Sequence, residues 1–322
     1  MYEISPMAPP RSSHPAFPVE ESCPSPTCPC RESPTGLDID RETMLNGSIG
    51  TYAEQVLIAT GRSDWKSRIE EDEDAVLLQQ MKGLLGRGGK YSDSKNNLTL
   101  PVNIDKSETS QVAVSHPASA YLVPSFQYVP AIPTDADSVD AFVRAFILPQ
   151  KLHHAHERLS REEQNILRRE DEKQRQFVGV RPVQEILVLI CGHGGRDERC
   201  GIYGPLLQAE FEDQLQRQNI SLLEESPKAE NVEAAESHVT ASELTARVGL
   251  ISHIGGHKFA GNVIIYIPPT FSQNALAGKG IWYGRVGPEQ VEGVVAKTIL
   301  EGKVIKDLFR GGIDQSGDPL RL

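Results

Sequence analysis

A short apolar run that ends in a cysteine and a glycine-rich loop constrains this chain more than any other feature. The run covers residues 186–190, Cys191 follows it directly, and a charged loop that begins with Gly192 leads to a second cysteine, Cys200. Short apolar runs bounded by glycine are typical of buried strands. We therefore expect Cys191 at the end of a central strand and Cys200 on the far side of the loop, near the start of a helix.

A second glycine-bearing loop carries two histidines. His253 and His257 lie between the apolar runs 245–251 and 263–267, and the three residues between them include two glycines. Thiolate and imidazole are the ligands that zinc and iron–sulfur clusters accept from proteins. The candidate metal ligands are Cys191, Cys200, His253 and His257.

Three interpretations of this set remain open. The first is a [2Fe–2S] cluster with mixed ligation, because imidazole can replace thiolate on one iron and raises the potential. The second is structural zinc, which favours His-x-x-x-His but usually has its cysteines closer together than Cys191 and Cys200. The third is a catalytic Cys191 with His193 or His257 as its base, although no third, orienting residue is evident. A single histidine in a glycine loop, such as His193, is more typical of an ordinary hydrogen-bonding residue.

Charge and cysteine content narrow the class of protein. The 322 residues include 33 Lys and Arg against 44 Asp and Glu, a net charge of −11, which disfavours a nucleic-acid binder with a basic face. No apolar run approaches the roughly 18 residues of a membrane span, so we expect no membrane insertion. Five cysteines disfavour a disulfide framework and suit a reducing compartment. Residues 1–21 have no signal-peptide pattern and no convincing mitochondrial presequence.

Two segments differ in composition from the rest. Residues 1–35 are rich in proline and serine and are predicted to be a disordered tail. This tail contains Cys23, Cys28 and Cys30, which form either a redox-active or metal-binding thiol cluster or a set of exposed cysteines. Residues 151–177 are almost purely polar and indicate a helical linker, and their histidines are more typical of a solvated helix than of a metal site.

The remaining residues form two predicted domains, 36–150 and 178–322, with similar orders of elements. In the first we expect a strand at 54–59, a helix at 65–85, strands at 98–104 and 119–128, and a helix at 137–147. In the second we expect a strand at 183–190, a helix at 203–218, strands at 245–251, 262–267 and 279–286, and a helix from 288. The shared order, strand-helix-strand-strand-helix, predicts an α/β protein with two thioredoxin-like domains. Only the second has cysteines and histidines in its loops.

Three segments of the chain resemble the sucrase/ferredoxin-like family of fungi. They are CGHGGRDERCG at 191–201, HIGGHKFAGN at 253–262 and WYGRV at 282–286. The resemblance covers residues from about 20 to about 315. It implies a thioredoxin-like ferredoxin domain at the C-terminal end, whose [2Fe–2S] cluster is bound by Cys191, Cys200, His253 and His257.

The resemblance also implies a role and a location. The family's mitochondrial branch implies a part in thiol redox balance, to which Cys23, Cys28 and Cys30 contribute, and a mitochondrial location with the cytoplasm as the alternative. We expect an electron carrier with an unidentified redox partner protein rather than an enzyme. A thiol oxidoreductase is the main alternative, although no Cys-x-x-Cys begins a helix. A structural-zinc binding module is the third.

Overall fold

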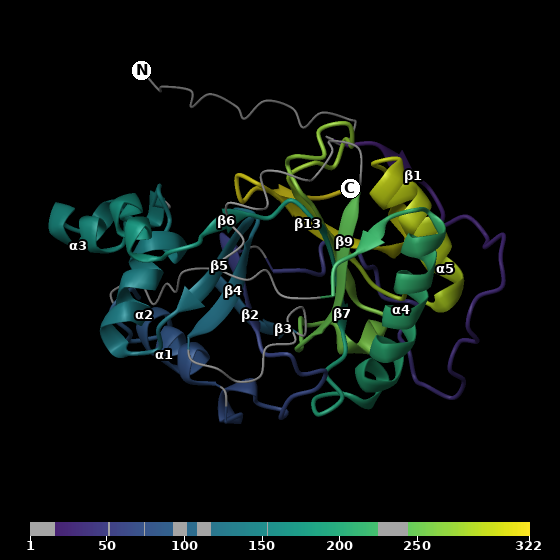
Figure 1. The fold of residues 1–322 in the computed structure, drawn as a ribbon, viewed down its shortest axis with the longest axis horizontal. Helices are drawn as coiled ribbons and strands as arrows, with labels where there is room; N and C mark the ends of the chain where they lie inside the picture. The colour runs from purple at the N-terminus through teal and green to yellow at the C-terminus, as the bar shows by residue number, and fades with distance from the viewer. Residues whose placement is uncertain are drawn as a thin grey trace, which may run out of the picture.

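The computed structural model describes residues 17–50, 52–73, 75–92, 102–107, 117–152, 154–224 and 244–322, and it is a mixed α/β protein, as predicted (Figure 1). The strands are β1 (Val19–Glu20), β2 (Glu54–Ala59), β3 (Val102–Ser107), β4 (Ala118–Val123), β5 (Gln127–Ile132), β6 (Arg181–Pro182), β7 (Ile186–Cys191), β8 (Ser221–Leu222), β9 (Thr245–Ile251), β10 (Val263–Ile267), β11 (Lys279–Tyr283), β12 (Val304–Ile305), β13 (Phe309–Asp314) and β14 (Pro319–Leu320). The α-helices are α1 (Val76–Leu85), α2 (Ala136–Phe142), α3 (Arg161–Ile166), α4 (Glu198–Arg217) and α5 (Pro288–Val294).

Short helical turns complete the secondary structure. The π-helical turns η2 (Val143–Ile147) and η7 (Val295–Leu300) extend α2 and α5. The 3₁₀ turns are η1 (Ile69–Glu71), η3 (His154–Arg158), η4 (Asp171–Gln176), η6 (His257–Phe259) and η8 (Lys306–Leu308). None of the helices in the described ranges is long and apolar enough to cross a membrane.

The strands have the same relative order in the two halves of the molecule. In the first half, residues 52–147, the order is β5-β4-β2-β3, with β2 and β3 parallel and β4 antiparallel to β2. In the second half, residues 186–320, the order β11-β10-β7-β9 has the same relations, and β13 and β14 extend it beyond β11. This arrangement is consistent with a thioredoxin-like fold.

One sheet runs through both halves, because Ser107 at the end of β3 pairs with Ile251 at the end of β9. The helices lie at opposite ends of the molecule, with α1 and α2 beside the first half and α4 and α5 beside the second (Figure 1). Each helix pair covers its own apolar core. A third core contains residues of both halves, including Leu57 of β2 and Leu189 of β7, so the two halves pack against each other.

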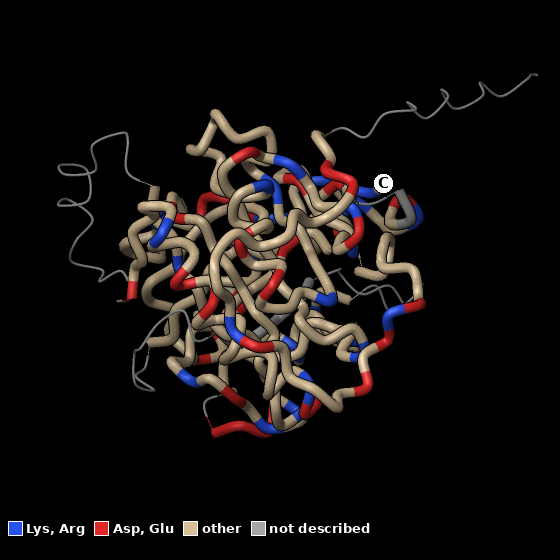
Figure 2. Tube along the Cα trace, turned by 90° about the vertical axis from the view of Figure 1, so that its right-hand side faces the viewer, with Lys and Arg blue, Asp and Glu red and all other residues tan. Residues whose placement is uncertain are grey.

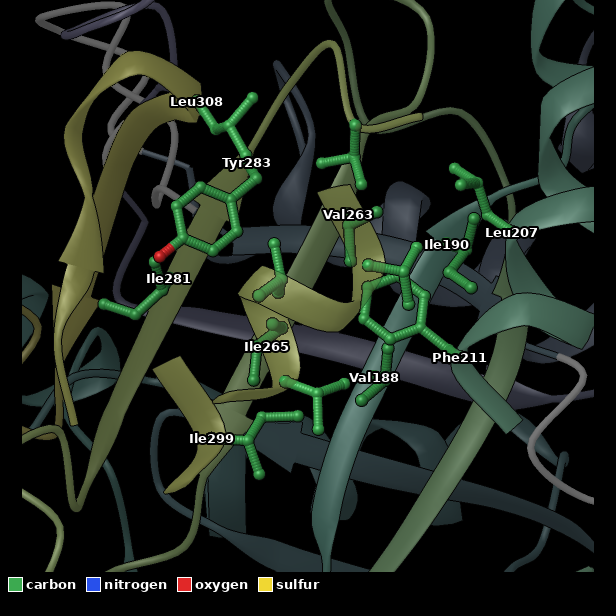
Figure 3. Packing of buried hydrophobic residues seen from close by; sticks show 14 of the residues in the cluster. Val188, Ile190, Leu207, Phe211, Val263, Ile265, Ile281, Tyr283, Ile299 and Leu308 are labelled. Carbon is green, nitrogen blue, oxygen red and sulfur yellow. The ribbon is translucent and has the colours of Figure 1, made fainter. Parts of the chain in front are cut away.

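The apolar run of β7 serves two of these cores because successive side chains of a strand point to opposite faces. Val188 and Ile190 face α4, where they meet Leu207 and Phe211 (Figure 3). Leu187 and Leu189 face the core between the halves. Burial on both faces explains why this strand is a continuous apolar run rather than an alternating one.

Several predicted boundaries differ from the structure. The helix expected from residue 65 begins at Val76, because Asp72 binds the Lys66 amide at 3.2 Å and keeps the preceding residues in a turn. The strand expected at 119–128 is a hairpin of β4 and β5, since Pro124 has no N–H to continue the ladder. The helix expected from 203 begins earlier, at Glu198, and Asp197 caps it by accepting from the Arg199 amide. Residues 98–101 of the strand expected at 98–104 lie outside the described residues.

Residues 17–50 form a segment that we call the strap. The composition predicts a disordered tail over residues 1–35, of which 1–16 lie outside the described residues. Residues 17–35 instead lie against the second half. Phe17 is buried, β1 pairs with β12, and Arg31 forms an ion pair with Glu210 of α4 at 2.9 Å. The predicted linker, 151–177, contains the short helices η3, α3 and η4.

Candidate metal centre

The two predicted loops meet at one edge of the sheet. Strands β7 and β9 are parallel, and Cys191 at the end of β7 is the register partner of Ile251 at the end of β9. The loop that contains His253 therefore starts beside Cys191. Cys200 is the third residue of α4, whose first turn follows the cysteine loop. Both sulfur positions match the expectation from the sequence.

Glycines allow α4 to lie directly on the cysteine loop. A Cβ on Gly204 would lie 2.6 Å from the Cα of Gly192, and a Cβ on Gly201 would lie 2.7 Å from the Cα of Gly194. Real Cβ contacts are longer, so a side chain at either helix position would push the helix away. The close approach brings Cys200 to Cys191.

The two cysteines are buried, and Cys200 donates a hydrogen bond to Cys191. Cys191 is 2% exposed and Cys200 is 1% exposed. The hydrogen bond from Cys200 lowers the pKa of Cys191, and His253 lowers it further, against the opposing effect of burial. The same hydrogen bond, together with burial, raises the pKa of Cys200. Cys191 is thus the thiol that deprotonates first.

The two histidines each have a buried ring nitrogen without a hydrogen-bond partner. Their ring centroids are 5.2 Å apart. Among the described residues, three buried side-chain nitrogen or oxygen atoms have no hydrogen-bond partner, and two of these are Nδ1 of His253 and Nδ1 of His257. Buried polar atoms are nearly always bonded, so these two unpartnered ring nitrogens in one loop are the atoms of the site that a ligand could engage. The Nε2 atom of His257 lies on the other side of its ring, 4.0 Å from Oδ2 of Asp197.

His193 holds the loops in place. Its Nδ1 accepts from the His253 amide at 3.0 Å, so its Nε2 carries the hydrogen and donates to the Lys66 carbonyl at 2.9 Å. Trp65 packs edge-on against its ring. Both ring nitrogens are occupied, which agrees with the prediction that His193 is an ordinary hydrogen-bonding residue.

A buried arginine, which the sequence did not single out, supports the histidine loop from below. Arg310 of β13 is 1% exposed, and its Nη1 donates to the Gly255 carbonyl at 3.1 Å and to Oδ1 of Asn262 at 2.8 Å. Burial lowers the pKa of Arg310 to about 10, and the negative charges of Cys191 and Cys200 oppose this shift. The only sequence signal is a charged residue inside a buried strand.

The donors are not arranged around a single point. In the described part of the chain, no three or more His, Cys, Asp or Glu side chains are grouped so that they could hold one metal ion. What the structure places together is a cysteine pair and a histidine pair, linked by the contact between Cys191 and His253.

The cysteines of the strap lie elsewhere. Sγ of Cys28 is 3.2 Å from Nε2 of Gln214 and 2.9 Å from Nη1 of Arg217, near the end of α4. Gln214 is 14 residues after Cys200, or about 21 Å along a helix that rises 1.5 Å per residue. Burial, with help from Asp307 and Glu289, raises the pKa of Cys23 to about 12. These thiols and the candidate centre are separate sites.

A mixed α/β fold with two buried cysteines and two histidines at one sheet edge defines a protein with a candidate metal or redox centre. Comparison with known families is specific: the model of the sucrase/ferredoxin-like family matches residues 45–311. The chain belongs to this family.

Curated relatives share the name "Altered inheritance of mitochondria protein 32". The protein of Meyerozyma guilliermondii is 42% identical over 132 residues, which are 41% of this chain and 36% of the relative. That of Clavispora lusitaniae is 43% identical over 133 residues, 40% of this chain and 36% of the relative. The match spans about a third of the length of these relatives. No solved structure matches the chain.

Proposed function

We propose that this chain is an electron-transfer protein whose second half binds a [2Fe–2S] cluster through Cys191, Cys200, His253 and His257. In this proposal each half is a thioredoxin-like unit, within the bounds 36–150 and 178–322. The observation that carries the proposal is the pair of unpartnered Nδ1 atoms in the loop that starts beside the buried Cys191. The donor set fits the group, because iron in such clusters accepts both thiolate and imidazole.

The paired arrangement of the donors supports a cluster over a single zinc ion. Structural zinc needs four ligands around one point. A [2Fe–2S] cluster has two irons, each with two protein ligands, so two pairs suffice. We assign the two cysteines to one iron and the two histidines to the other; one of each per iron is the alternative.

The chain's own residues prepare the site for this group. Deprotonation begins at Cys191, whose pKa is lowered by the hydrogen bond from Cys200. His193 holds the histidine loop through the His253 amide. When bound, the cluster supplies a one-electron redox centre, and neutral imidazole in place of anionic thiolate raises its potential.

The biological setting is part of the proposal. The relatives' name refers to the inheritance of mitochondria, which supports a mitochondrial setting for the redox and thiol role that we propose. The electron partner is a protein that docks near His257, whose side chain is 44% exposed, beside Arg196, Asp197 and Lys258. Figure 2 shows basic and acidic residues interspersed on the side of the molecule that it presents.

The direct test is an absorption and EPR spectrum of anaerobically purified protein, with iron, sulfide and zinc counted on the same sample. We expect brown protein with about two irons and two sulfides per chain and a reduced EPR signal of low mean g, as for imidazole-ligated clusters. Colourless protein with one zinc per chain would instead assign the site a structural role.

A matched variant tests the histidine ligands. His257→Cys should retain a cluster but lower its potential and the pH dependence of that potential, because an anionic thiolate replaces a neutral, titratable imidazole. Lys258→Cys, one residue further, is the control and should leave both nearly unchanged. An unchanged potential in His257→Cys would show that His257 is not a ligand.

A thiol oxidoreductase is the second candidate, and the hydrogen bond that lowers the pKa of Cys191 supports it, because the thiolate is the nucleophile in thiol–disulfide exchange. In this alternative Cys191 and Cys200 form a disulfide, and the two electrons pass to a disulfide of the partner protein. Colourless, metal-free protein that reduces a disulfide, and loses this activity in Cys191→Ser, would favour it. Replacing Cys23, Cys28 and Cys30 together by serine tests the strap thiols in the same assay.

A further inference from the structure

The most unusual charged group near the candidate centre is Arg310. Its side chain is 1% exposed, yet no described Asp or Glu lies within 4.0 Å of its guanidinium group. Its polar partners are neutral: the Gly255 carbonyl, Asn262, and the side chain and carbonyl of Ser48. A buried charge without an opposite charge is costly, so its presence calls for an anion close by.

The geometry places this cation directly beneath the histidine loop. A Cβ on Gly256 would lie 2.4 Å from Nη2 of Arg310, so the guanidinium group is in contact with the backbone between His253 and His257. Gly256 has a φ of 73°, which glycine adopts readily, so this residue provides both the turn and the space. The ring of Phe259, which ends the same loop, lies 5.4 Å from the guanidinium carbon.

Elements distant in sequence hold Arg310 in this position. Trp282 of β11 lies 6.0 Å from its guanidinium carbon, and Ser48 of the strap accepts from its Nε at 3.2 Å. The backbone of Arg310 also accepts from the Gly47 amide at 2.9 Å. Strand, strap and aromatic ring thus fix the cation where it faces the loop.

We propose that Arg310 is a positioning residue that serves as the buried counter-charge of the centre, holding the histidine loop while its positive charge stabilises the reduced cluster. This inference rests on the proposed function. Two thiolates and an electron added to the cluster bring negative charge into a buried site, and a fixed cation in low dielectric stabilises the state with more negative charge. The cation raises the reduction potential.

The test compares the potentials of charge-conserving and charge-removing variants. The midpoint potential of cluster-loaded protein is measured by EPR-monitored titration for the unaltered chain, Arg310→Lys and Arg310→Met. We expect Arg310→Met to weaken reduction about tenfold, which equals 59 mV for one electron, and Arg310→Lys to retain most of the potential. Lys258→Met removes an exposed charge next to His257 and is the control. Its shift should be smaller and should vanish at 1 M salt, whereas the Arg310→Met shift should persist.

The outcomes separate the two proposals. If the unaltered protein contains no iron and sulfide, the proposed function is contradicted, whatever the Arg310 variants show. If the cluster is present but Arg310→Met has an unchanged potential, or if Lys and Met variants shift equally, Arg310 does not act through its charge. Thermal melting of metal-free samples shows whether each variant folds. Should Arg310→Met not fold, Arg310→Gln, which keeps a donor for the Gly255 carbonyl without the charge, takes its place.

Discussion

The first and second halves of the molecule have equivalent central strands, β2 and β7, but the loops that follow these strands differ in composition and role. Strands β2 and β7 have the same length and equivalent places in the strand order, and each has a parallel neighbour, β3 and β9 respectively. However, β2 ends in Ala59 where β7 ends in Cys191. In the described residues after Ala59, the loop supports the second half and contains no cysteine. Asp64 binds the Gly195 amide at 3.1 Å, and Trp65 and Lys66 hold His193. The loop after β2 in the first half therefore packs against the cysteine loop of the second half.

The largest expected effect is the loss of the centre itself. Cys191→Ser should abolish iron binding and the visible spectrum, because a serine hydroxyl is a poor substitute for a thiolate ligand. Iron and sulfide counts on anaerobically purified protein measure this. Cys23→Ser removes another partly buried thiol outside the centre and should leave the spectrum intact. Full iron content in Cys191→Ser would show that Cys191, which stands where the first half has Ala59, is not an iron ligand.

The next effect tests whether the halves unfold as one. Leu57 is fully buried in the core that the halves share, so Leu57→Ala should reduce the free energy of unfolding by about 2–5 kcal/mol. Urea unfolding should show one transition, shifted to lower urea. Val178→Ala, at a position that is 78% exposed, should stay within about 0.5 kcal/mol of the unaltered chain. Two transitions, of which only one moves, would mean that the halves are independent.

A third comparison uses the buried glutamate at the start of each central strand. Burial raises the pKa of Glu54 to about 7, against weaker opposing effects of Ser125 and Arg169. Burial also opposes ionisation of Glu185, but hydrogen bonds and charges from Arg181 and Arg247 outweigh it and lower its pKa. The two groups should therefore respond to pH in opposite directions.

The sign follows from proton linkage. The folded state holds the Glu54 proton more tightly, so its contribution to stability is full below about pH 4.5 and is lost as pH rises to about 7, a loss of up to about 3 kcal/mol. Glu185 contributes above its unfolded pKa, and that contribution is lost in acid. Urea unfolding from pH 4.5 to 8 should show a flatter decline in Glu54→Gln. The same decline in the unaltered chain and in Glu54→Gln would show that the pKa of Glu54 is not raised by folding. Glu185→Gln, the control, should retain the decline.

The smallest effect concerns the contact between the loop after β2 and the cysteine loop. Asp64→Asn weakens the bond to the Gly195 amide and should cost about 1 kcal/mol in urea unfolding. It should also speed the loss of iron to a chelator. Asp135→Asn weakens a bond of similar length at the start of α2 and should leave iron loss unchanged. Equal rates of iron loss in the two variants would show that the first half does not steady the cysteine loop.

Features that depend on a short stretch of sequence, such as strands and the loops that follow them, could be predicted from the sequence. The apolar run before Cys191 predicted a buried strand, and the glycine loops predicted that the cysteine and histidine pairs lie at strand ends. Sequence reasoning missed Arg310 and Ser48, which are 262 residues apart and meet only after the strap crosses the second half. It also merged β4 and β5, because the hairpin has no glycine to mark its turn. Contacts between distant segments leave little trace in local composition.

The strap has a consequence for the timing of synthesis. Val19 pairs with Val304, and Ser48 accepts a hydrogen bond from Arg310. These contacts of the strap can form only after residues more than 250 positions later in the chain have been synthesised. While the chain emerges from the ribosome, the strap has no partner and the histidine loop has no cation beneath it. The loops of the candidate centre can reach their final arrangement only after β13 has left the exit tunnel, because until then Arg310 is not in place to hold the Gly255 carbonyl.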